Sequence, residues 1–265
     1  MLNEIQPMNS ITSKFDLKEK VAIVTGSSKG IGKSIARGLA ENGARVVVSS
    51  RKQEAVDAVA GEFREAGLQA VGIACHVGDD AQRNALIEAA LSAFGRIDIL
   101  VNNAAINPYY GPLEGSEEGV FDKIMEVNVK APWVLSNRVL PHMKAQGGGS
   151  IINIASVEGI RPGFGLGLYS ATKAALIMLT KNQAKEWGRY GVRANVICPG
   201  LVKTKFSQGL WADEKLVQHF TKALPLGRIA HPDEMAGVVM LLASDAGSYM
   251  TGGVYTADGG YLVSG

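Results

Sequence analysis

The sequence predicts an α/β protein with a doubly wound parallel sheet of about seven strands and helices on both faces. Short apolar runs alternate with amphipathic segments along most of the chain, which is the order of strands joined by helical crossovers. Runs such as Val46-Val47-Val48 and Ile151-Ile152 are continuously apolar, as in strands that are covered on both faces. The length of 265 residues and the hydrophobic fraction of 46% suit one large domain.

The expected elements follow one another from the first apolar run onward. Strands are expected at residues 21–25, 45–50, 69–75, 97–102, 150–155, 193–197 and 254–256. Helices are expected at residues 30–42, 52–66, 79–94, about 117–146, 169–190 and 232–244. Gly43 and Gly67 directly follow the first two helices, where a left-handed backbone favours glycine.

Two segments interrupt this alternation. Residues 1–16 show no periodicity, so we expect a flexible lead-in, followed by one domain over residues 17–265. The stretch at about 200–226 is long and irregular, and it lies between a strand and the last helix. Because irregular loops of that length commonly close over sites, we expect a substrate lid there.

Composition and charge argue against several classes of protein. The formal net charge of +2 provides no basic field for nucleic acid, and no apolar run reaches the roughly 18 residues of a membrane span. The first residues lack the cationic and apolar segments of a secretory signal, and the last residues carry no Ser-Lys-Leu address. Cys75 and Cys198 lie at the ends of strand-like runs without a Cys or His at ligand spacing. We therefore expect a cytoplasmic protein with two reduced core cysteines and no metal.

The first strand leads into a glycine-rich segment. Residues 25–32 read TGSSKGIG, directly after the strand and at the start of the first helix, which is the context of a dinucleotide cradle. Gly26 permits the tight turn. Gly30 and Gly32 allow a pyrophosphate to approach the helix N-terminus, where free amides and the helix dipole favour anions.

The end of the second strand bears on the choice of cofactor. The ribose of a bound dinucleotide is expected there, about 20 residues after the glycines, and an acidic residue would repel a 2′-phosphate. The chain has Ser50 and Arg51 at this point and Lys29 inside the glycine segment, which together suit a phosphate. The alternative is that Lys29 and Arg51 are solvated surface cations. We predict NADP(H) in preference to NAD(H).

Tyr169 and Lys173 are candidates for the chemistry. A spacing of four residues places both on one face of a helix. A neighbouring ammonium lowers the pKa of a phenol. A nicotinamide-dependent reductase needs such a group, because hydride arriving at a carbonyl carbon requires a proton at the oxygen. Alone, the pair commonly marks nothing more than a helix face.

Further segments join these two in a recognisable order. They are residues 102–105 (Asn-Asn-Ala-Ala), Asn128, Ser156, and Cys198-Pro199-Gly200 with Thr204. With this order and spacing, residues 17–262 resemble the short-chain dehydrogenase/reductase family. Within it, residues 48–53, 75–78, 107–108, 128–132 and 199–204 resemble the NADPH-dependent retinol and carbonyl reductases of the dehydrogenase/reductase group.

There are departures from the family pattern. The common Asn-Asn-Ala-Gly is here Asn102-Asn103-Ala104-Ala105. The usual aspartate that contacts the adenine amino group is replaced by His76, although Val77 is kept. The peroxisomal tail often found in mammalian relatives is absent from this sequence.

The resemblance implies a single-domain Rossmann fold and a role for each matched residue. Tyr169 would exchange a proton with the substrate oxygen, Lys173 would lower the Tyr169 pKa and hold the nicotinamide ribose, and Ser156 would hydrogen-bond the same oxygen. Asn128 would place a water that links Lys173 to solvent. The implied cofactor contacts are Gly26, Ser28, Lys29, Gly30, Ile31, Gly32, Ser50, Arg51, His76, Val77, Asn103, Ala104, Ala105, Tyr169, Lys173, Pro199, Gly200, Val202 and Thr204.

Pro132 supports the Asn128 role on physical grounds. It lies four residues after Asn128 in an otherwise helical run, so it cannot donate to the Asn128 carbonyl, and its ring opens the helix. The freed carbonyl can accept from a water. The alternative is a tolerated kink without a function.

The substrate wall is expected from residues 107–111, 157–167 and 206–211. These contribute Tyr109, Tyr110, Ile160, Phe164, Phe206, Leu210 and Trp211. An apolar wall suits a hydrophobic ketone or aldehyde, although these side chains could instead pack the lid or a subunit contact. Glu158 and Arg161 could bind a polar substrate, so a 3-oxoacyl thioester (acyl-carrier-protein) reductase and then a sugar or polyol dehydrogenase are the alternatives.

Two further expectations concern assembly and a different class of function. Family members usually form homotetramers through their two long helices and the C-terminal strand region, here about 117–146, 169–190 and 251–262. A non-catalytic NADP(H)-binding protein is the remote alternative. Such proteins tend to lose the tyrosine–lysine pair, which this chain keeps.

Overall fold

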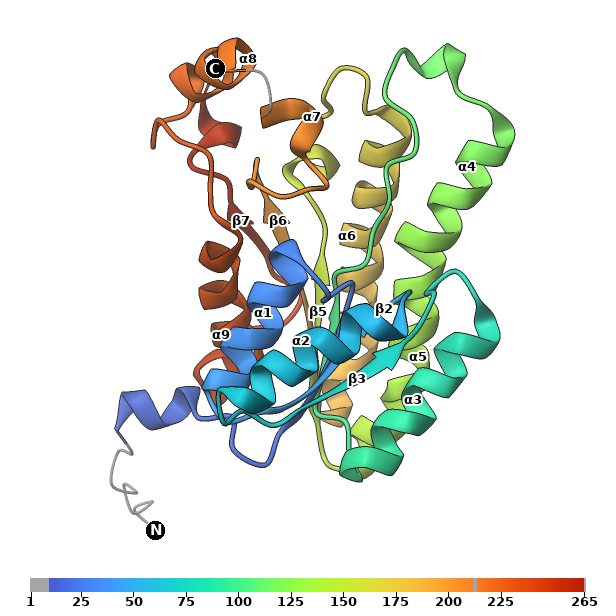
Figure 1. The fold of residues 1–265 in the computed structure, drawn as a ribbon, viewed down its shortest axis with the longest axis vertical. Coiled ribbons are helices and arrows are strands. Elements are labelled where there is room, and N and C mark those ends of the chain that lie inside the picture. Colours follow the sequence, from blue (N-terminus) through green and yellow to red (C-terminus); the bar gives the residue numbers. More distant parts are fainter. Residues whose placement is uncertain (1–9, 212–213, 265) are drawn as a thin grey trace.

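The computed structural model describes residues 10–211 and 214–264, and its core is one parallel sheet (Figure 1). Seven strands are arranged in the order β3-β2-β1-β4-β5-β6-β7. They are β1 (Val21–Thr25), β2 (Arg45–Ser50), β3 (Ala70–Ala74), β4 (Ile99–Asn102), β5 (Gly149–Ile154), β6 (Val192–Pro199) and β7 (Val254–Ala257). Each neighbouring pair is parallel, so the predicted fold class is confirmed.

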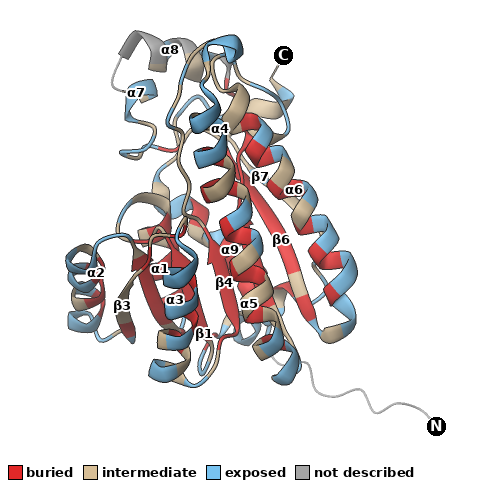
Figure 2. Cartoon of the chain, turned by 90° about the vertical axis from the view of Figure 1, so that its right-hand side faces the viewer, coloured by how far each residue is buried: buried red, intermediate tan, exposed pale blue. Residues whose placement is uncertain are grey.

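Helices cover both faces of this sheet. They are α1 (Gly30–Glu41), α2 (Gln53–Glu65), α3 (Asp80–Phe94), α4 (Glu118–Met125), α5 (Ala131–Ala145), α6 (Gly167–Trp187), α7 (Gln208–Trp211), α8 (Glu214–Ala223) and α9 (Ala236–Ala243). Buried residues of α1, α2 and α9 form one hydrophobic cluster with the sheet, and those of α3, α5 and α6 form a second cluster. Figure 2 shows the buried strands between these helical layers.

Burial on both faces explains the continuous apolar strands. Val46 and Val48 pack into the cluster with α1, whereas Val47 between them packs into the cluster with α3. Successive side chains of a strand point to opposite faces, so both sets must be apolar. Each fully buried valine contributes roughly 1.5–3 kcal/mol to the free energy of unfolding.

The helix expected at about 117–146 is interrupted in the structure. A π-helical turn, η3 (Glu126–Lys130), separates α4 from α5, and the Ala131 amide donates to the Glu126 carbonyl. Pro132 explains the interruption, because it cannot donate to the carbonyl of Asn128 and its ring crowds that carbonyl. The predicted opening at Pro132 is confirmed, and the single long helix is wrong.

Three other segments differ from the expected pattern. The last helix begins as a 3-10 turn, η6 (Pro232–Met235), before α9. The irregular stretch at 200–226 contains the short helices α7 and α8. Within the expected lead-in, Ile11–Phe15 forms a 3-10 helix, η1, that contacts η7 (Asp245–Gly247), whereas residues 1–9 lie outside the described residues.

None of the helices in the described ranges has the length and apolar composition needed to cross a membrane. Cys75 and Cys198 are buried, unpaired thiols. Burial raises the pKa of each thiol to about 11, so both stay protonated at neutral pH.

Candidate active site

The chain reverses its winding direction beside β1, and in such sheets this reversal marks the place where a crevice is expected. β1 lies between β2 and β4, and the carboxyl ends of all seven strands reach the same edge. Ligands of such sheets bind where the strand order reverses. The segments that follow β1, β4, β5 and β6 at this edge contain most of the predicted site residues.

The glycine segment is braced by residues at the ends of β1 and β4. Thr25 Oγ1 accepts hydrogen bonds from the amides of Asn103 (3.0 Å) and Ala104 (3.1 Å). Asn103 Nδ2 donates to the carbonyls of Thr25 (2.9 Å) and Gly26 (3.2 Å). These hydrogen bonds to the segment after β4 hold the turn in place.

The glycines leave the helix N-terminus open. Gly26 and Gly30 have positive φ angles of 66° and 57°, which L side chains rarely adopt. A Cβ on Gly32 would meet the Gly26 carbonyl, and one on Gly26 would lie 2.9 Å from the Ala104 Cα. The side chain of Lys29, the N-cap residue of α1, makes no capping hydrogen bond. The free amides and the close backbone approach therefore fit the pyrophosphate of a dinucleotide.

The predicted 2′-phosphate site lies at the end of β2. The amide of Ser49 donates to Ser27 Oγ (2.9 Å), and the amide of Ser27 donates to the Ser49 carbonyl (3.0 Å), so β2 and the glycine segment are joined. Lys29 and Arg51 are exposed and form no ion pair with any residue that the structure describes. The two cations are thus available to an anion at this edge.

The end of β3 differs chemically from the family pattern. The Cys75 amide donates to the Ser50 carbonyl (2.8 Å), which brings the segment after β3 beside the end of β2. His76 Nδ1 accepts from the Gly78 amide (3.1 Å), so its ring is held within its own turn. Val77 is buried, and its carbonyl accepts from Arg83 Nη1 (2.5 Å).

Ser156, Tyr169 and Lys173 gather after β5 and at the start of α6. The Lys173 ammonium nitrogen lies 5.5 Å from the centre of the Tyr169 ring and donates to the Ile154 carbonyl (2.9 Å). Ser156 directly follows this end of the sheet, and its Oγ accepts from the Glu158 amide (3.2 Å). A phenol, an amine and a hydroxyl therefore occupy one region.

The sequence led us to expect that Lys173 lowers the Tyr169 pKa, but the Tyr169 pKa is raised in the structure. Burial raises the pKa of the Tyr169 phenol, and the Ser156 hydroxyl opposes that rise in part. Burial lowers the pKa of Lys173 to about 8. The reason is that both side chains lose hydration, and loss of hydration disfavours each charged form. In this structure, Tyr169 therefore holds its proton at neutral pH.

Asn128 lies in the π-helical turn and braces two other segments. Its Oδ1 accepts from the Ile106 amide (2.9 Å), and its Nδ2 donates to the Ile106 carbonyl (2.9 Å) and to Thr172 Oγ1 (3.2 Å). Thr172 precedes Lys173 in α6. The Asn128 side chain thus connects the segment after β4 to α6.

The remaining predicted cofactor residues lie around the same crevice. Thr204 Cγ2 would be 3.4 Å from a Cβ on Gly30, and the Gly200 amide donates to the Ala257 carbonyl (3.0 Å). Val202 is buried and forms a β-bridge with Ala230. Pro199 ends β6, Ile31 packs on the hydrophobic cluster, and Ser28 and Ala105 are half-buried.

The predicted substrate wall is apolar and exposed. Tyr110, Phe164 and Phe206 have exposed fractions of 63%, 86% and 58%. The Phe206 ring centre lies 6.2 Å from that of Tyr169. Two members have other contacts, since the Tyr109 hydroxyl donates to the Pro112 carbonyl (2.8 Å) and Trp211 Nε1 donates to the Thr204 carbonyl (2.7 Å). Most of the wall is therefore available to a ligand.

The polar candidates near this wall are engaged with other groups. Ser170 Oγ donates to Glu158 Oε2 (3.4 Å), and burial raises the pKa of Glu158. Arg161 donates to the Ser264 carbonyl (3.1 Å) and stacks on the Tyr261 ring. Each side chain therefore has a partner within the protein, although Arg161 remains exposed.

Several bracing residues were not predicted. Thr25 and Ser27 hold the glycine segment, and Asn102 Nδ2 donates to Asn153 Oδ1 (2.8 Å) across neighbouring strands. The available signal was a polar residue at the end of an otherwise apolar strand. Arg83 gave no such signal, because it lies on a helix that the sequence marks as amphipathic.

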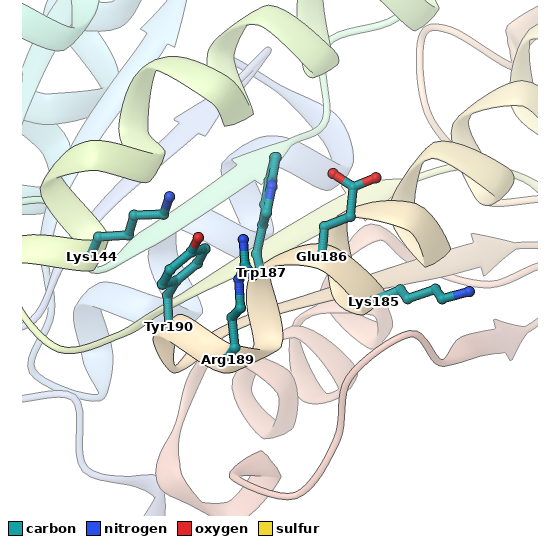
Figure 3. Close-up of a pocket in the computed structure, with 6 residues that line it drawn as sticks. All are labelled: Lys144, Lys185, Glu186, Trp187, Arg189 and Tyr190. Carbon is teal, nitrogen blue, oxygen red and sulfur yellow. The ribbon is translucent and has the colours of Figure 1, made fainter.

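A pocket at the opposite edge of the sheet does not belong to this site. It has a volume of about 420 Å³ and lies at the C-terminal ends of α5 and α6 (Figure 3). It is lined by Lys144, Lys185, Glu186, Trp187, Arg189 and Tyr190. Lys144 and Arg189 lie 3.6 Å and 4.7 Å from the Tyr190 ring centre, so the aromatic ring engages both cations.

Comparisons with curated proteins give a consistent relationship. A family model described as "Enoyl-(Acyl carrier protein) reductase" matches residues 26–262. The rabbit (Oryctolagus cuniculus) protein "Dehydrogenase/reductase SDR family member 4" is 44% identical over 252 residues, which span 95% of this chain and 97% of that protein. The human protein of the same name is 41% identical over 252 residues, with 95% and 91% covered.

Solved structures agree on the fold and the class of reaction. A gluconate 5-dehydrogenase from Burkholderia cenocepacia, in complex with NADP and tartrate, has a TM-score of 0.92 and 37% identity over 96% of this chain and 99% of that chain. A 7 alpha-hydroxysteroid dehydrogenase, complexed with NADH and 7-oxo glycochenodeoxycholic acid, has a TM-score of 0.91 and 32% identity over 96% and 98%. With the parallel sheet, these matches show that the chain belongs to the short-chain dehydrogenase/reductase (SDR) family, whose oxidoreductases act on alcohols and carbonyls.

Proposed function

We propose that the protein is an NADP(H)-dependent reductase of hydrophobic ketones or aldehydes. The observation that carries this proposal is the setting of Tyr169. Its phenol holds a proton in a region shared with Ser156 and Lys173, and the neighbouring Phe206 is one of several exposed apolar side chains. A proton donor beside an apolar wall suits a carbonyl compound that carries apolar substituents.

Each residue has a distinct role in the proposed reaction. The cofactor supplies hydride to the carbonyl carbon when it is bound. Tyr169 gives its proton to the carbonyl oxygen, and Ser156 donates a hydrogen bond to that oxygen and stabilises its developing charge. Lys173 holds the nicotinamide ribose and returns a proton toward Tyr169. Asn128 places a water, because its carbonyl faces Pro132 and receives no amide from it.

The preference for NADP(H) rests on Lys29 and Arg51. Both cations are exposed, Lys29 at the N-cap of α1 and Arg51 directly after β2, and Ser50 adds a hydroxyl donor. A 2′-phosphate there would gain charge-assisted hydrogen bonds that NAD(H) lacks. We expect the Kd of NADPH to be at least about tenfold below that of NADH, measured by fluorescence titration. Equal affinities would contradict the preference.

A panel of carbonyl compounds tests the substrate class. NADPH oxidation is followed with acetophenone, cyclohexanone, decanal, acetoacetyl-CoA and 5-ketogluconate. We expect the highest kcat/KM with acetophenone or decanal, because burial of apolar area supplies the binding free energy. Absence of turnover with every compound, together with tight NADPH binding, would favour a non-catalytic NADP(H)-binding protein.

A sugar acid or polyol is the second candidate. Structures named gluconate 5-dehydrogenase resemble this chain at 37% and 38% identity. The side chains offered for a polar substrate argue against it, since Glu158 and Arg161 have partners within the protein. The same two residues would have to bind the polar thioester arm of a 3-oxoacyl substrate. Faster reduction of 5-ketogluconate or acetoacetyl-CoA would establish one of these alternatives.

We also propose a homotetramer in the cytoplasm. Phe121, Trp133 and Met178 are exposed on α4, α5 and α6, and a cavity of about 510 Å³ lies between these helices. Exposed apolar groups on one helical face favour contact with a second copy. The two unpaired thiols suit a reducing compartment. Multi-angle light scattering tests the assembly, and a monomeric mass would contradict it.

A further inference from the structure

Arg83 on α3 is the largest fully buried side chain of the described residues and is 1% exposed. Its Nη1 donates to the Val77 carbonyl (2.5 Å) and to Glu126 Oε1 (2.9 Å). Its Nη2 donates to Asp80 Oδ1 (2.9 Å). A buried guanidinium is strongly destabilising unless it is paired, so these three partners fix where Arg83 lies.

Val77 and Glu126, the two partners of Arg83 Nη1, belong to opposite ends of the proposed site. Val77 lies in the segment after β3, which hydrogen bonds to the end of β2 through Cys75 and Ser50. The adenosine half of a dinucleotide lies over these strand ends in a doubly wound sheet. Glu126 is the first residue of the π-helical turn that contains Asn128. One guanidinium therefore joins the adenosine side to the turn beside the chemistry.

On this side, Glu126 provides the hydrogen bond between the π-helical turn and α3, and Val127 adds an apolar contact in the hydrophobic cluster that includes Val77. Glu126 Oε2 also pairs with Lys130 (2.8 Å), but Lys130 belongs to the same turn and is exposed, so this pair fixes the turn to no other element. Asn128 then orients Ile106 and Thr172 through its own hydrogen bonds. A shift of Glu126 would thus be passed to Asn128 and to the start of α6.

We propose that Arg83 is a positioning residue that sets both the adenosine side of the cofactor site and the turn that carries Asn128. It acts through Val77 on cofactor affinity and through Glu126 on turnover. This inference rests on the proposed function. It predicts that the two effects are separable, because each belongs to a different partner of the same side chain.

Substitution of Arg83 tests the combined effect. Arg83→Met removes both connections, and Arg83→Lys keeps the charge but not the planar fork of donors. For both variants, we expect the Kd of NADPH to rise about tenfold, and kcat per NADPH-binding site to fall about tenfold, since small misplacements near a reacting centre have effects of this size or larger. The assay uses the panel compound that the wild type reduces fastest.

Substitution of Glu126 separates the two connections. Glu126→Ala should lower kcat about tenfold and leave the Kd of NADPH within about twofold, because the Val77 contact remains. Glu126→Gln keeps an acceptor and should restore most of the turnover. Light scattering on each variant checks that the assembly is unchanged. These variants also keep the test valid if Arg83→Met does not fold.

Two control variants each remove an arginine and its ion pair but leave the contacts with Val77 and Glu126 in place. Arg138→Met removes another arginine bound to Asp80 but leaves the Val77 and Glu126 contacts. Arg96→Met removes a partly buried ion pair with Asp98 near the opposite edge of the sheet. Both should lower Tm while leaving the Kd and kcat within about twofold of wild type.

The proposal is overturned if the Arg83 variants match these controls, with a lower Tm and unchanged Kd and kcat per site. It is also overturned if Glu126→Ala raises the Kd of NADPH as much as Arg83→Met does. A wild-type protein that neither binds NADPH nor reduces any panel compound would instead contradict the proposed function.

Discussion

The proposed cofactor side and the proposed substrate side of the site are built in different ways. On the cofactor side, Thr25, Ser27 and Asn103 pair with the backbone of neighbouring segments, and two of these side chains are fully buried. On the substrate side, Tyr110 and Phe164 expose most of their surface, and the polar Glu158 and Arg161 bind other parts of the protein. On the first side, the polar side chains already have hydrogen-bond partners in the folded protein. On the second side, apolar side chains remain exposed to water.

This difference has a physical consequence. Buried hydrogen bonds make the shape of the cofactor side part of the stability of the fold, since an unpaired buried group costs about 1–3 kcal/mol. The exposed apolar wall contributes only when something covers it, at about 25 cal/mol per Å². Changes on the cofactor side should therefore affect stability or cofactor affinity. Changes to the wall should affect the substrate alone.

The largest effect is expected for the proposed proton donor, Tyr169, which lies between the two sides. Tyr169→Phe removes the proton donor, so kcat should fall at least about 100-fold. The Kd of NADPH should stay within about twofold, because the cradle keeps its hydrogen bonds. Stopped-flow kinetics and fluorescence titration measure the two quantities. Tyr110→Phe, in the exposed wall, is the matched control, and near wild-type turnover in Tyr169→Phe would contradict the assignment.

The second prediction tests how strongly the cofactor side is buried. Burial lowers the pKa of Lys173 from 10.5 to about 8. The charged amine therefore destabilises the folded, cofactor-free protein below pH 8, and this destabilisation is relieved as pH rises from about 8 to 10.5. Relative to Lys173→Met, the wild type should gain up to about 3 kcal/mol of stability over that window. Urea unfolding at several pH values measures the difference, and parallel curves would show that burial does not lower the Lys173 pKa.

The third prediction concerns the glycine segment. A Cβ at Gly32 would meet the backbone carbonyl of Gly26, which cannot move without breaking the bracing by Asn103. Gly32→Ala should lower the free energy of unfolding by about 1–3 kcal/mol and weaken NADPH binding. Gly237→Ala is the matched control, because nothing lies within 4 Å of its added Cβ. If both variants bind NADPH like the wild type, the close approach at Gly32 has no function.

The fourth prediction tests the π-helical turn. Pro132→Ala supplies an amide that can donate to the Asn128 carbonyl and restore a regular α-helix. Turnover should fall about threefold to tenfold, with a smaller change in the Kd of NADPH, because the carbonyl no longer accepts from water. Tm should be unchanged or higher. Unchanged turnover would leave Pro132 as a kink without a function.

The fold and the geometry of the glycine segment could be predicted from the sequence for a physical reason. Gly26, Gly30 and Gly32 are required by local backbone geometry, so their spacing alone indicates a turn into a helix N-terminus. The continuous apolar strands likewise reveal a sheet covered on both faces. Both signals are local and therefore visible in one sequence.

Other features were only partly predicted or were missed. Pro132 predicted an opening in the helix expected at 117–146, but not that a π-helical turn divides this helix in two. Other misses depend on contacts between distant segments. Arg83 looks like an exposed helical arginine until Val77 and Glu126 are placed beside it. The pKa of Tyr169 is raised because burial outweighs the hydrogen bond with Ser156, and burial is not visible in the spacing of two residues.

The smallest expected effect is in the substrate wall. Phe206→Ala should raise the KM of a hydrophobic ketone about threefold to tenfold, because Phe206 lies beside the Tyr169 ring. Phe164→Ala should change the KM by no more than about twofold, since this side chain is 86% exposed and has little contact to lose. Neither variant should alter the Kd of NADPH. Steady-state kinetics with acetophenone measure the KM of each variant, and thermal unfolding measures its Tm.

A loss of more than about 4 °C in Tm for Phe206→Ala would show that this aromatic packs the lid rather than the substrate. The wall would then be part of the fold, and the contrast between the two sides would disappear.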